Sequence, residues 1–166
     1  KEAGQSQLNL TLLADDADVS KQVAEYLQGA FEDLPNVKVT IKSIPKAQRL
    51  QAMMSGNYDM VVTGWQSIFA DAYNFLDVWI SNSSYNTSGY KDAKLDQLLS
   101  ETETKYGNEP QKRWTMLQDA EKILMKDQGT LPLYQANNLE LLRSSVKGVS
   151  FNPNGTPYDF KTAYIQ

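Results

Sequence analysis

The first 64 residues alternate between the periodicity of strands and that of helices, and this alternation constrains the fold more than any other feature of the sequence. Residues 8–13, 37–42 and 58–63 are apolar, or alternate apolar with polar side chains, as strands do. Between them, apolar residues recur every three or four positions over residues 19–34 and 47–54, which predicts two amphipathic helices. This order of elements, with short connections, predicts an α/β fold: a mainly parallel sheet with right-handed crossovers, flanked by helices.

The second half of the chain has a different pattern. Apolar stripes over residues 95–106 and 110–124 predict two helices, ended by Gly107 and Gly129. Residues 130–135 and 139–142 are strand-like, and Pro132 would make the first an edge strand or a crossing between domains. The tail, residues 151–166, has the turn-forming sequence Asn-Pro-Asn-Gly at residues 152–155, followed by an end rich in Tyr and Phe, and it has few obvious partners within the chain.

Composition excludes several classes of function. The 166 residues include no cysteine and no histidine, so a cysteine nucleophile, a Ser-His triad, a zinc finger, a haem-ligating histidine and a disulfide framework are excluded. Sixteen basic and 20 acidic residues give a formal charge of −4 without a basic cluster, which argues against nucleic acid as a partner. No apolar run is long enough to span a membrane. Because the chain starts at Lys1 with no signal peptide, we expect an artificial boundary or a processing site there.

The most site-like stretch follows the third predicted strand. Ligands of an open parallel sheet bind beyond the carboxyl ends of its strands, and this strand leads into Gly64, Trp65, Gln66 and Ser67. Glycine allows another backbone to approach closely, and tryptophan offers a flat wall with one hydrogen-bond donor. The loop continues to residue 74 with aromatic, amide, hydroxyl and acidic groups. The pattern alone supports equally well a second interpretation, in which Trp65 fills the protein core and the loop is an ordinary surface loop.

Other candidate sites are weaker. Asp15, Asp16 and Asp18 resemble the start of a calcium loop but lack its glycine and distal glutamate, so we expect them to be acids at a helix N-terminus. Asp71 and Asp77 could form a glycosidase-like pair, but any chain with 20 acidic residues offers such pairs. There is no phosphate-binding loop and no dinucleotide fingerprint. The sequence therefore predicts no catalytic residue, no metal site and no cofactor.

A series of short motifs resembles a known family over nearly the whole chain. The segment YDMVVTGW at residues 58–65 opens the series, and further segments follow it in order. Together they resemble the C-terminal lobe of the oligopeptide- and dipeptide-binding proteins of ABC importers, the family 5 extracellular solute-binding proteins. The later segments are ADAYNFL at 70–76, SNSSYNTSGY at 81–90, KLDQLL at 94–99, LPLY at 131–134 and YDFK at 158–161.

The resemblance implies a lobe of the periplasmic-binding-protein-like (type II) fold, which is half of a clamp that closes on a peptide. Residues 1–134 would form the C-terminal ligand-binding lobe, and residues 135–166 would return to an N-terminal lobe that lies outside this chain. Such proteins are not enzymes; they capture peptides in the periplasm, or on the cell surface through a lipid anchor in Gram-positive bacteria, and deliver them to ABC permease subunits. The anchor, the only expected membrane contact, would lie upstream of Lys1.

The resemblance also implies a set of peptide-binding residues. Gly64, Trp65, Gln66 and Ser67 match the part of the loop that touches the peptide backbone. Many members place an aspartate three residues after the tryptophan, where it holds the peptide's amino group. Here that position is Ile68, and the nearby Asp71 matches a second acidic position in the same loop. The ligand could therefore be a peptide held differently, a blocked or cyclic peptide, or another molecule.

Three other functions remain open at this point. A related lobe could bind another solute, such as a nickel chelate, a sugar or an opine, although a lobe without His or Cys is a poor direct ligand for a transition metal. A carboxylate-dependent hydrolase would need Asp71 or Asp77 for turnover. A purely adhesive surface module would need no ligand-driven closure.

Overall fold

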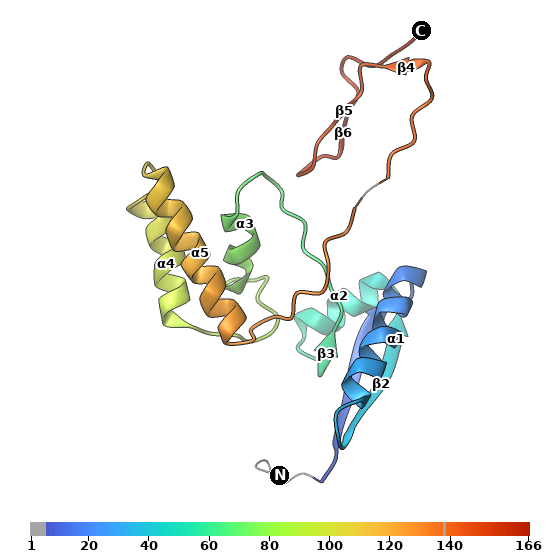
Figure 1. Ribbon diagram of the computed structural model, residues 1–166, viewed down its shortest axis with the longest axis vertical. Coiled ribbons are helices and arrows are strands. Elements are labelled where there is room, and N and C mark those ends of the chain that lie inside the picture. The colour runs from blue at the N-terminus through green and yellow to red at the C-terminus, as the bar shows by residue number, and fades with distance from the viewer. Residues whose placement is uncertain (1–5, 138) are drawn as a thin grey trace. The chain divides into compact units, whose positions relative to one another are not determined.

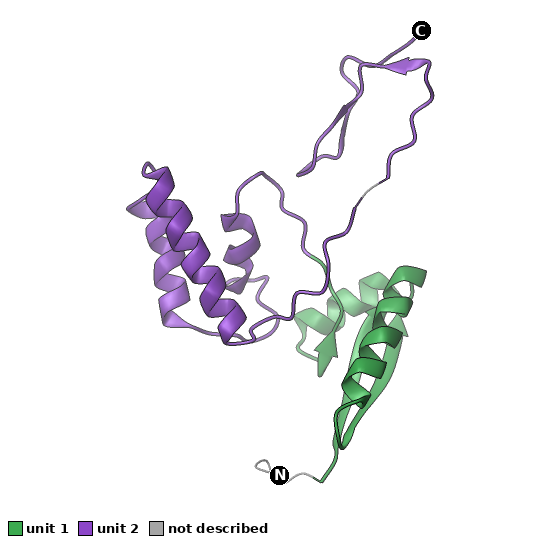
Figure 2. Cartoon of the chain, in the orientation of Figure 1, with its two compact units in different colours: residues 1–64 green, residues 65–166 purple. Residues whose placement is uncertain are grey.

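The computed structural model describes residues 6–137 and 139–166 (Figure 1). The chain divides into two compact units, residues 1–64 and residues 65–166 (Figure 2).

Unit 1 is built on a three-stranded parallel sheet in the order β2-β1-β3. Its strands are β1 (Leu8–Asp15), β2 (Val37–Ile44) and the short β3 (Met60–Val61), and its helices are α1 (Asp18–Glu32) and α2 (Lys46–Met54). The predicted order of strands and helices and the parallel sheet are confirmed. The third strand is shorter than residues 58–63, because only Met60 and Val61 pair with β1.

The core of unit 1 lies between β1, β2 and α1. Leu12 and Ala14 of β1, two residues apart, share one face of the strand with Val39 of β2 and pack against Ala24 and Leu27 of α1. Leu13, on the opposite face of β1, is also buried, with 2% of its surface exposed. A central strand is covered on both faces, which explains why residues 12–14 of β1 are all apolar and buried.

The three acids near the start of α1 do not act as one group. Asp15 is the last residue of β1, and its Oδ1 accepts a hydrogen bond of 2.6 Å from Nε of Arg49. Arg49 is buried, with only 4% of its surface exposed. Arg49 also donates to the hydroxyl of Thr63 at 3.0 Å. Only Asp18 lies in the first turn of α1. The N-cap residue, Ala17, has a methyl side chain, which cannot form a capping hydrogen bond to the helix. The expectation of three acids at the helix N-terminus is therefore corrected for Asp15, because an ion pair with Arg49 holds this residue at the carboxyl end of β1.

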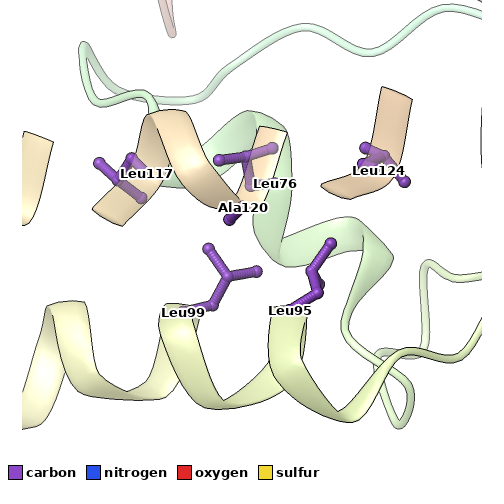
Figure 3. Close-up of a cluster of buried hydrophobic side chains, with 6 residues drawn as sticks. All are labelled: Leu76, Leu95, Leu99, Leu117, Ala120 and Leu124. Carbon is purple, nitrogen blue, oxygen red and sulfur yellow. The ribbon is translucent and has the colours of Figure 1, made fainter. Parts of the chain in front are cut away.

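Unit 2 is centred on two neighbouring helices, α4 (Ala93–Thr104) and α5 (Pro110–Lys126). Both helices follow the predicted stripes. The short helices α3 (Tyr73–Leu76) and η1 (Asp77–Trp79) come before them in the chain, and no sequence pattern had indicated them. Leucines of α3 and α4 point toward one face of α5 in a closed apolar cluster (Figure 3), made of Leu76, Leu95, Leu99, Leu117, Ala120 and Leu124.

The strands predicted after α5 are wrong. Residues 130–135 and 139–142 are all described, and none of them belongs to a strand. The only sheets in the described tail are two short antiparallel pairs, β4 (Val146–Lys147) with β7 (Tyr164–Ile165) and β5 (Ser150–Phe151) with β6 (Tyr158–Asp159). A strand needs a neighbour for its backbone groups, and the described residues supply none for residues 130–135 and 139–142.

Candidate functional site

The site loop, residues 65–74, is organised around the side chain of Asn74. This side chain is buried, and its Oδ1 accepts a hydrogen bond of 2.8 Å from the backbone N–H of Ile68. The carbonyl of Asn74 accepts a second bond, of 2.6 Å, from Nε1 of Trp65. One residue at the start of α3 therefore fixes both the indole ring and the backbone at Ile68. Gly64, the first predicted site residue, is the last residue of unit 1.

Trp65 forms a wall at the surface. Its ring is 39% exposed and meets Tyr85 edge to face, with the centroids 5.1 Å apart. A tryptophan that plugged the core would be buried on all sides, so the interpretation of Trp65 as a core plug is not supported. The ring is immobilised by its hydrogen bond to Asn74 and by Tyr85, while part of it stays open to solvent.

Gln66 and Ser67 differ in what they offer a ligand. Gln66 is exposed, and within the described part of the chain the backbone groups of Trp65 and Gln66 have no hydrogen-bond partner. Ser67 is 1% exposed, and its hydroxyl donates to the carbonyl of Phe69. Its own carbonyl accepts a hydrogen bond of 3.2 Å from the N–H of Gly155 in the tail. Ser67 therefore shapes the loop, and the free backbone groups belong to Trp65 and Gln66.

Ile68 presents an apolar side chain to solvent. It is 67% exposed, and the neighbouring Phe69 is 51% exposed. The N–H of Ile68 is already bonded to Asn74. The loop thus offers free backbone groups at Trp65 and Gln66, followed directly by an apolar surface.

The carboxylate of Asp71 is bound by a side chain of α5. Its carboxylate accepts hydrogen bonds from the backbone N–H of Tyr73 at 2.8 Å and from Nη1 of Arg113, which lies 3.1 Å from Oδ1 and 3.0 Å from Oδ2. The other guanidinium nitrogen, Nη2, lies 2.6 Å from Oε1 of Glu103. The bond to Glu103, aided by Asp71 and opposed by desolvation, raises the pKa of Arg113. The charge of Asp71 is therefore already compensated.

A shallow pocket of about 450 Å³ adjoins this ion pair. Its walls carry acidic side chains, a basic side chain and an aromatic ring. The lining residues are Asp71, Glu103, Gly107, Pro110, Arg113 and Trp114.

The two acids considered for hydrolysis have different environments. Asp71 is paired with Arg113. Asp77 accepts a long bond of 3.4 Å from Nδ2 of Asn74 through Oδ2, and its Oδ1 is buried without a partner among the described residues. Within the same residues, no group of three or more acidic side chains is placed to hold a metal ion.

Sequence reasoning missed three residues that build this site. The sequence places Asn74 at the end of the loop, Arg113 in a predicted helix and Gly155 in a predicted turn. It does not indicate that any of the three contributes to the site. Two of them act through partners distant in sequence: Arg113 bonds to Asp71, 42 positions earlier, and Gly155 bonds to Ser67. Asn74 acts within its own loop, on Trp65 and Ile68. The Asn-Pro-Asn-Gly sequence did signal a turn there, but no local pattern tells what that turn contacts.

Comparison with known proteins assigns the family. The family described as bacterial extracellular solute-binding proteins, family 5 (middle), matches residues 1–87, more than half of the chain. The chain belongs to this family. The family 5 resemblance drawn from the motifs is thereby confirmed.

Similar proteins of this family are named for peptides. The dipeptide-binding protein of Lactococcus lactis is 32% identical over all of the chain. Two solved structures also align, over 99% of the chain each: an oligopeptide ABC transporter substrate-binding domain of Bacillus anthracis (31% identity, TM-score 0.88) and Listeria monocytogenes OppA bound to peptide (28% identity, TM-score 0.85). The chain spans about a third of their length, 31%, 32% and 31% respectively.

These likenesses also confirm the predicted fold class, an α/β lobe of the periplasmic-binding-protein-like kind. Members of family 5 are extracellular or periplasmic solute-binding proteins rather than enzymes. None of the described helices is long and apolar enough to cross a membrane.

Proposed function

We propose that this chain is the C-terminal lobe of a solute-binding protein that captures peptides for an ABC importer. The observation that carries the proposal is the free backbone of Trp65 and Gln66, set between a fixed indole wall and the exposed Ile68. A peptide can add to such a backbone as an extra strand, with main-chain hydrogen bonds providing affinity for any sequence. The names of the similar proteins, dipeptide- and oligopeptide-binding, support the same ligand class.

The proposed contact residues have separate roles. Trp65 and Gln66 offer backbone groups to the peptide, Gly64 lets the peptide backbone approach closely because it has no side chain, and Ser67 keeps the loop in shape. Ile68 provides an apolar contact in place of a carboxylate. Asp71 would have to leave Arg113 before it could hold a peptide amine, so its proposed role is to fix the loop to α5.

The remainder of the protein would complete the site. Residues 1–134 would form one lobe, and residues 135–166 would join an N-terminal lobe outside this chain. Supporting this, several large apolar side chains of the tail are exposed: Leu139, Leu141, Phe151, Tyr158, Phe160, Tyr164 and Ile165. The closed protein would deliver its peptide to ABC permease subunits, from the periplasm or from a lipid anchor on the cell surface.

The test is to identify what the full-length protein carries. Mass spectrometry of the molecules that co-purify with it should find peptides, and calorimetry should then measure their binding to the emptied protein. A sugar, an opine or a nickel chelate as the bound molecule would overturn the proposal. Hydrolysis of the bound peptide, lost on Asp71→Asn or Asp77→Asn, would show an enzyme instead.

A further inference from the structure

The turn at residues 152–157 lies against the site loop where its free backbone ends. It connects β5 to β6 and is held by hydrogen bonds from Asn152 to the carbonyls of Pro157 (3.0 Å, backbone) and Thr156 (3.0 Å, side chain). At its tip, the N–H of Gly155 donates to the carbonyl of Ser67 at 3.2 Å. This contact joins the tail to the proposed peptide site within unit 2.

Gly155 is the residue that allows this approach. Its φ of 71° lies in the left-handed region, which side chains disfavour. A Cβ atom at this position would lie 2.7 Å from the carbonyl oxygen of Ile68, closer than such atoms come in proteins. The carbonyls of Ser67 and Ile68 thus both face Gly155, with no room for a larger residue.

Several backbone groups directly beyond Gln66 are also occupied. The N–H of Ile68 is bonded to Asn74, and the carbonyl of Phe69 accepts from Ser67 and from the N–H of Asp71. A peptide that adds as a strand can therefore pair at Trp65 and Gln66, and its pairing is interrupted where the carbonyl of Ser67 and the N–H of Ile68 are already bonded.

We infer that the turn at residues 152–157 is a stop that sets the register of the bound peptide. The inference rests on the proposed function. One end of the peptide meets Gly155 and the exposed Ile68, and the rest of the peptide extends away from the turn. The turn thereby limits extension at one terminus only.

The first experiment measures how the full-length protein tolerates longer peptides. A peptide that binds is compared by calorimetry with versions carrying one extra alanine at the amino or at the carboxyl end. The wild type should bind the peptide extended at one end about tenfold more weakly than the peptide extended at the other end. In Gly155→Ala, this difference in affinity should fall below about threefold. Gly56→Ala is the matched control, because Gly56 has a φ of 68° with open space around it; it should behave as the wild type.

Two results would overturn the inference while leaving peptide binding intact: equal tolerance of both extensions by the wild type, or the same discrimination in Gly155→Ala and Gly56→Ala. A wild type that binds no peptide would instead refute the proposed function.

A second measurement needs neither a peptide nor a variant. Amide hydrogen exchange in the peptide-free protein should be slower at Gly155 than at Gly89, an exposed glycine that also has a positive φ and whose N–H has no partner among the described residues. Equal exchange at the two glycines would mean that the turn does not rest on Ser67, and it would overturn the inference.

Discussion

At the scale of single residues, we expect the side chain of Ile68 to decide whether the proposed site distinguishes a free peptide amine from a blocked one. A free peptide amine carries a positive charge that loses water when it is buried, and isoleucine cannot accept a hydrogen bond from it. Asp71 in the same loop is already bonded to Arg113. The wild-type protein should therefore discriminate little between a free and an N-acetylated peptide of the same sequence.

Ile68→Asp should shift this balance toward the free amine by about tenfold, or about 1.4 kcal/mol, because a carboxylate forms a charge-assisted hydrogen bond with an ammonium group. Calorimetry on the full-length protein with the matched peptide pair measures the shift. Ile68→Asn, of similar shape but uncharged, is the control and should shift it less. Since Ile68 is 67% exposed, neither variant should lower stability much; a strong wild-type preference for the free amine would contradict the prediction.

Tyr90 should make stability fall at high pH. Desolvation, aided by the hydrogen bond of its hydroxyl to Asp127 (3.1 Å), raises the pKa of Tyr90 to about 12. The folded protein therefore keeps the phenol proton while the unfolded chain, with a tyrosine pKa of about 10, releases it. The contribution is complete below pH 10 and is lost between about pH 10 and 12.

The measurement is the difference in Tm between the wild type and Tyr90→Phe. This difference should be constant at neutral pH and should shrink as the pH rises from about 10 to about 12. Tyr134→Phe is the control, since Tyr134 is 60% exposed and its hydroxyl has no hydrogen bond within the described chain. Parallel curves for both variants would rule out this role of Tyr90.

At the scale of elements, Arg113 connects the site loop to α4 and α5. Its guanidinium bonds to Asp71 of the loop and to Glu103 of α4, and its side chain is 19% exposed. Arg113→Met would leave Asp71 half-buried without its cation, at a cost of about 1–3 kcal/mol.

Arg113→Met should therefore lower both the Tm and the affinity for peptide, because the loop loses its fixed position. Arg143→Met, at an exposed position of the tail, is the control for loss of one positive charge. Adding Asp71→Asn to Arg113→Met should recover part of the lost stability, because it removes the unpaired charge. Unchanged peptide affinity in Arg113→Met would show that the loop holds its shape without α5.

Helices and strands were predictable where the sequence of the element itself has a periodic apolar pattern. The apolar stripes of α1, α4 and α5 each face a core, so the periodicity directly reports burial. The strand prediction failed at residues 130–135 and 139–142, because β-propensity describes a residue that has a neighbouring strand, and no strand of the described chain pairs with either segment. The short α3 had no periodicity to detect in four residues.

At the scale of the whole molecule, this chain alone should bind peptide poorly. A clamp buries its ligand between two lobes, and one lobe offers part of the contacts while the cost of immobilising the peptide stays nearly the same. Calorimetry on residues 1–166 and on the full-length protein should show much weaker binding by the shorter chain. Comparable affinities would contradict the two-lobe model.

The isolated chain should also self-associate. Leu139 and Leu141 of the tail are 94% and 100% exposed, and the short β-strands of the tail have unpaired edges. Exposed apolar side chains and strand edges recruit other chains, including a second copy. Light scattering at increasing concentration should detect oligomers, and Leu139→Ser with Leu141→Ser should reduce them; a monomer at every concentration would refute this expectation.

Periodicity and chain order in the sequence are sufficient to predict the α/β class, the parallel sheet of unit 1, the principal helices and the position of the site loop after the third strand. These features are predictable because periodicity and chain order are local properties. The folded structure was needed to find that Asn74 fixes Trp65 and Ile68, that Arg113 bonds to Asp71, and that Gly155 bonds to Ser67. Such contacts join groups brought together by packing, and a hydrogen bond depends on distances and angles in space that no spacing along the chain encodes.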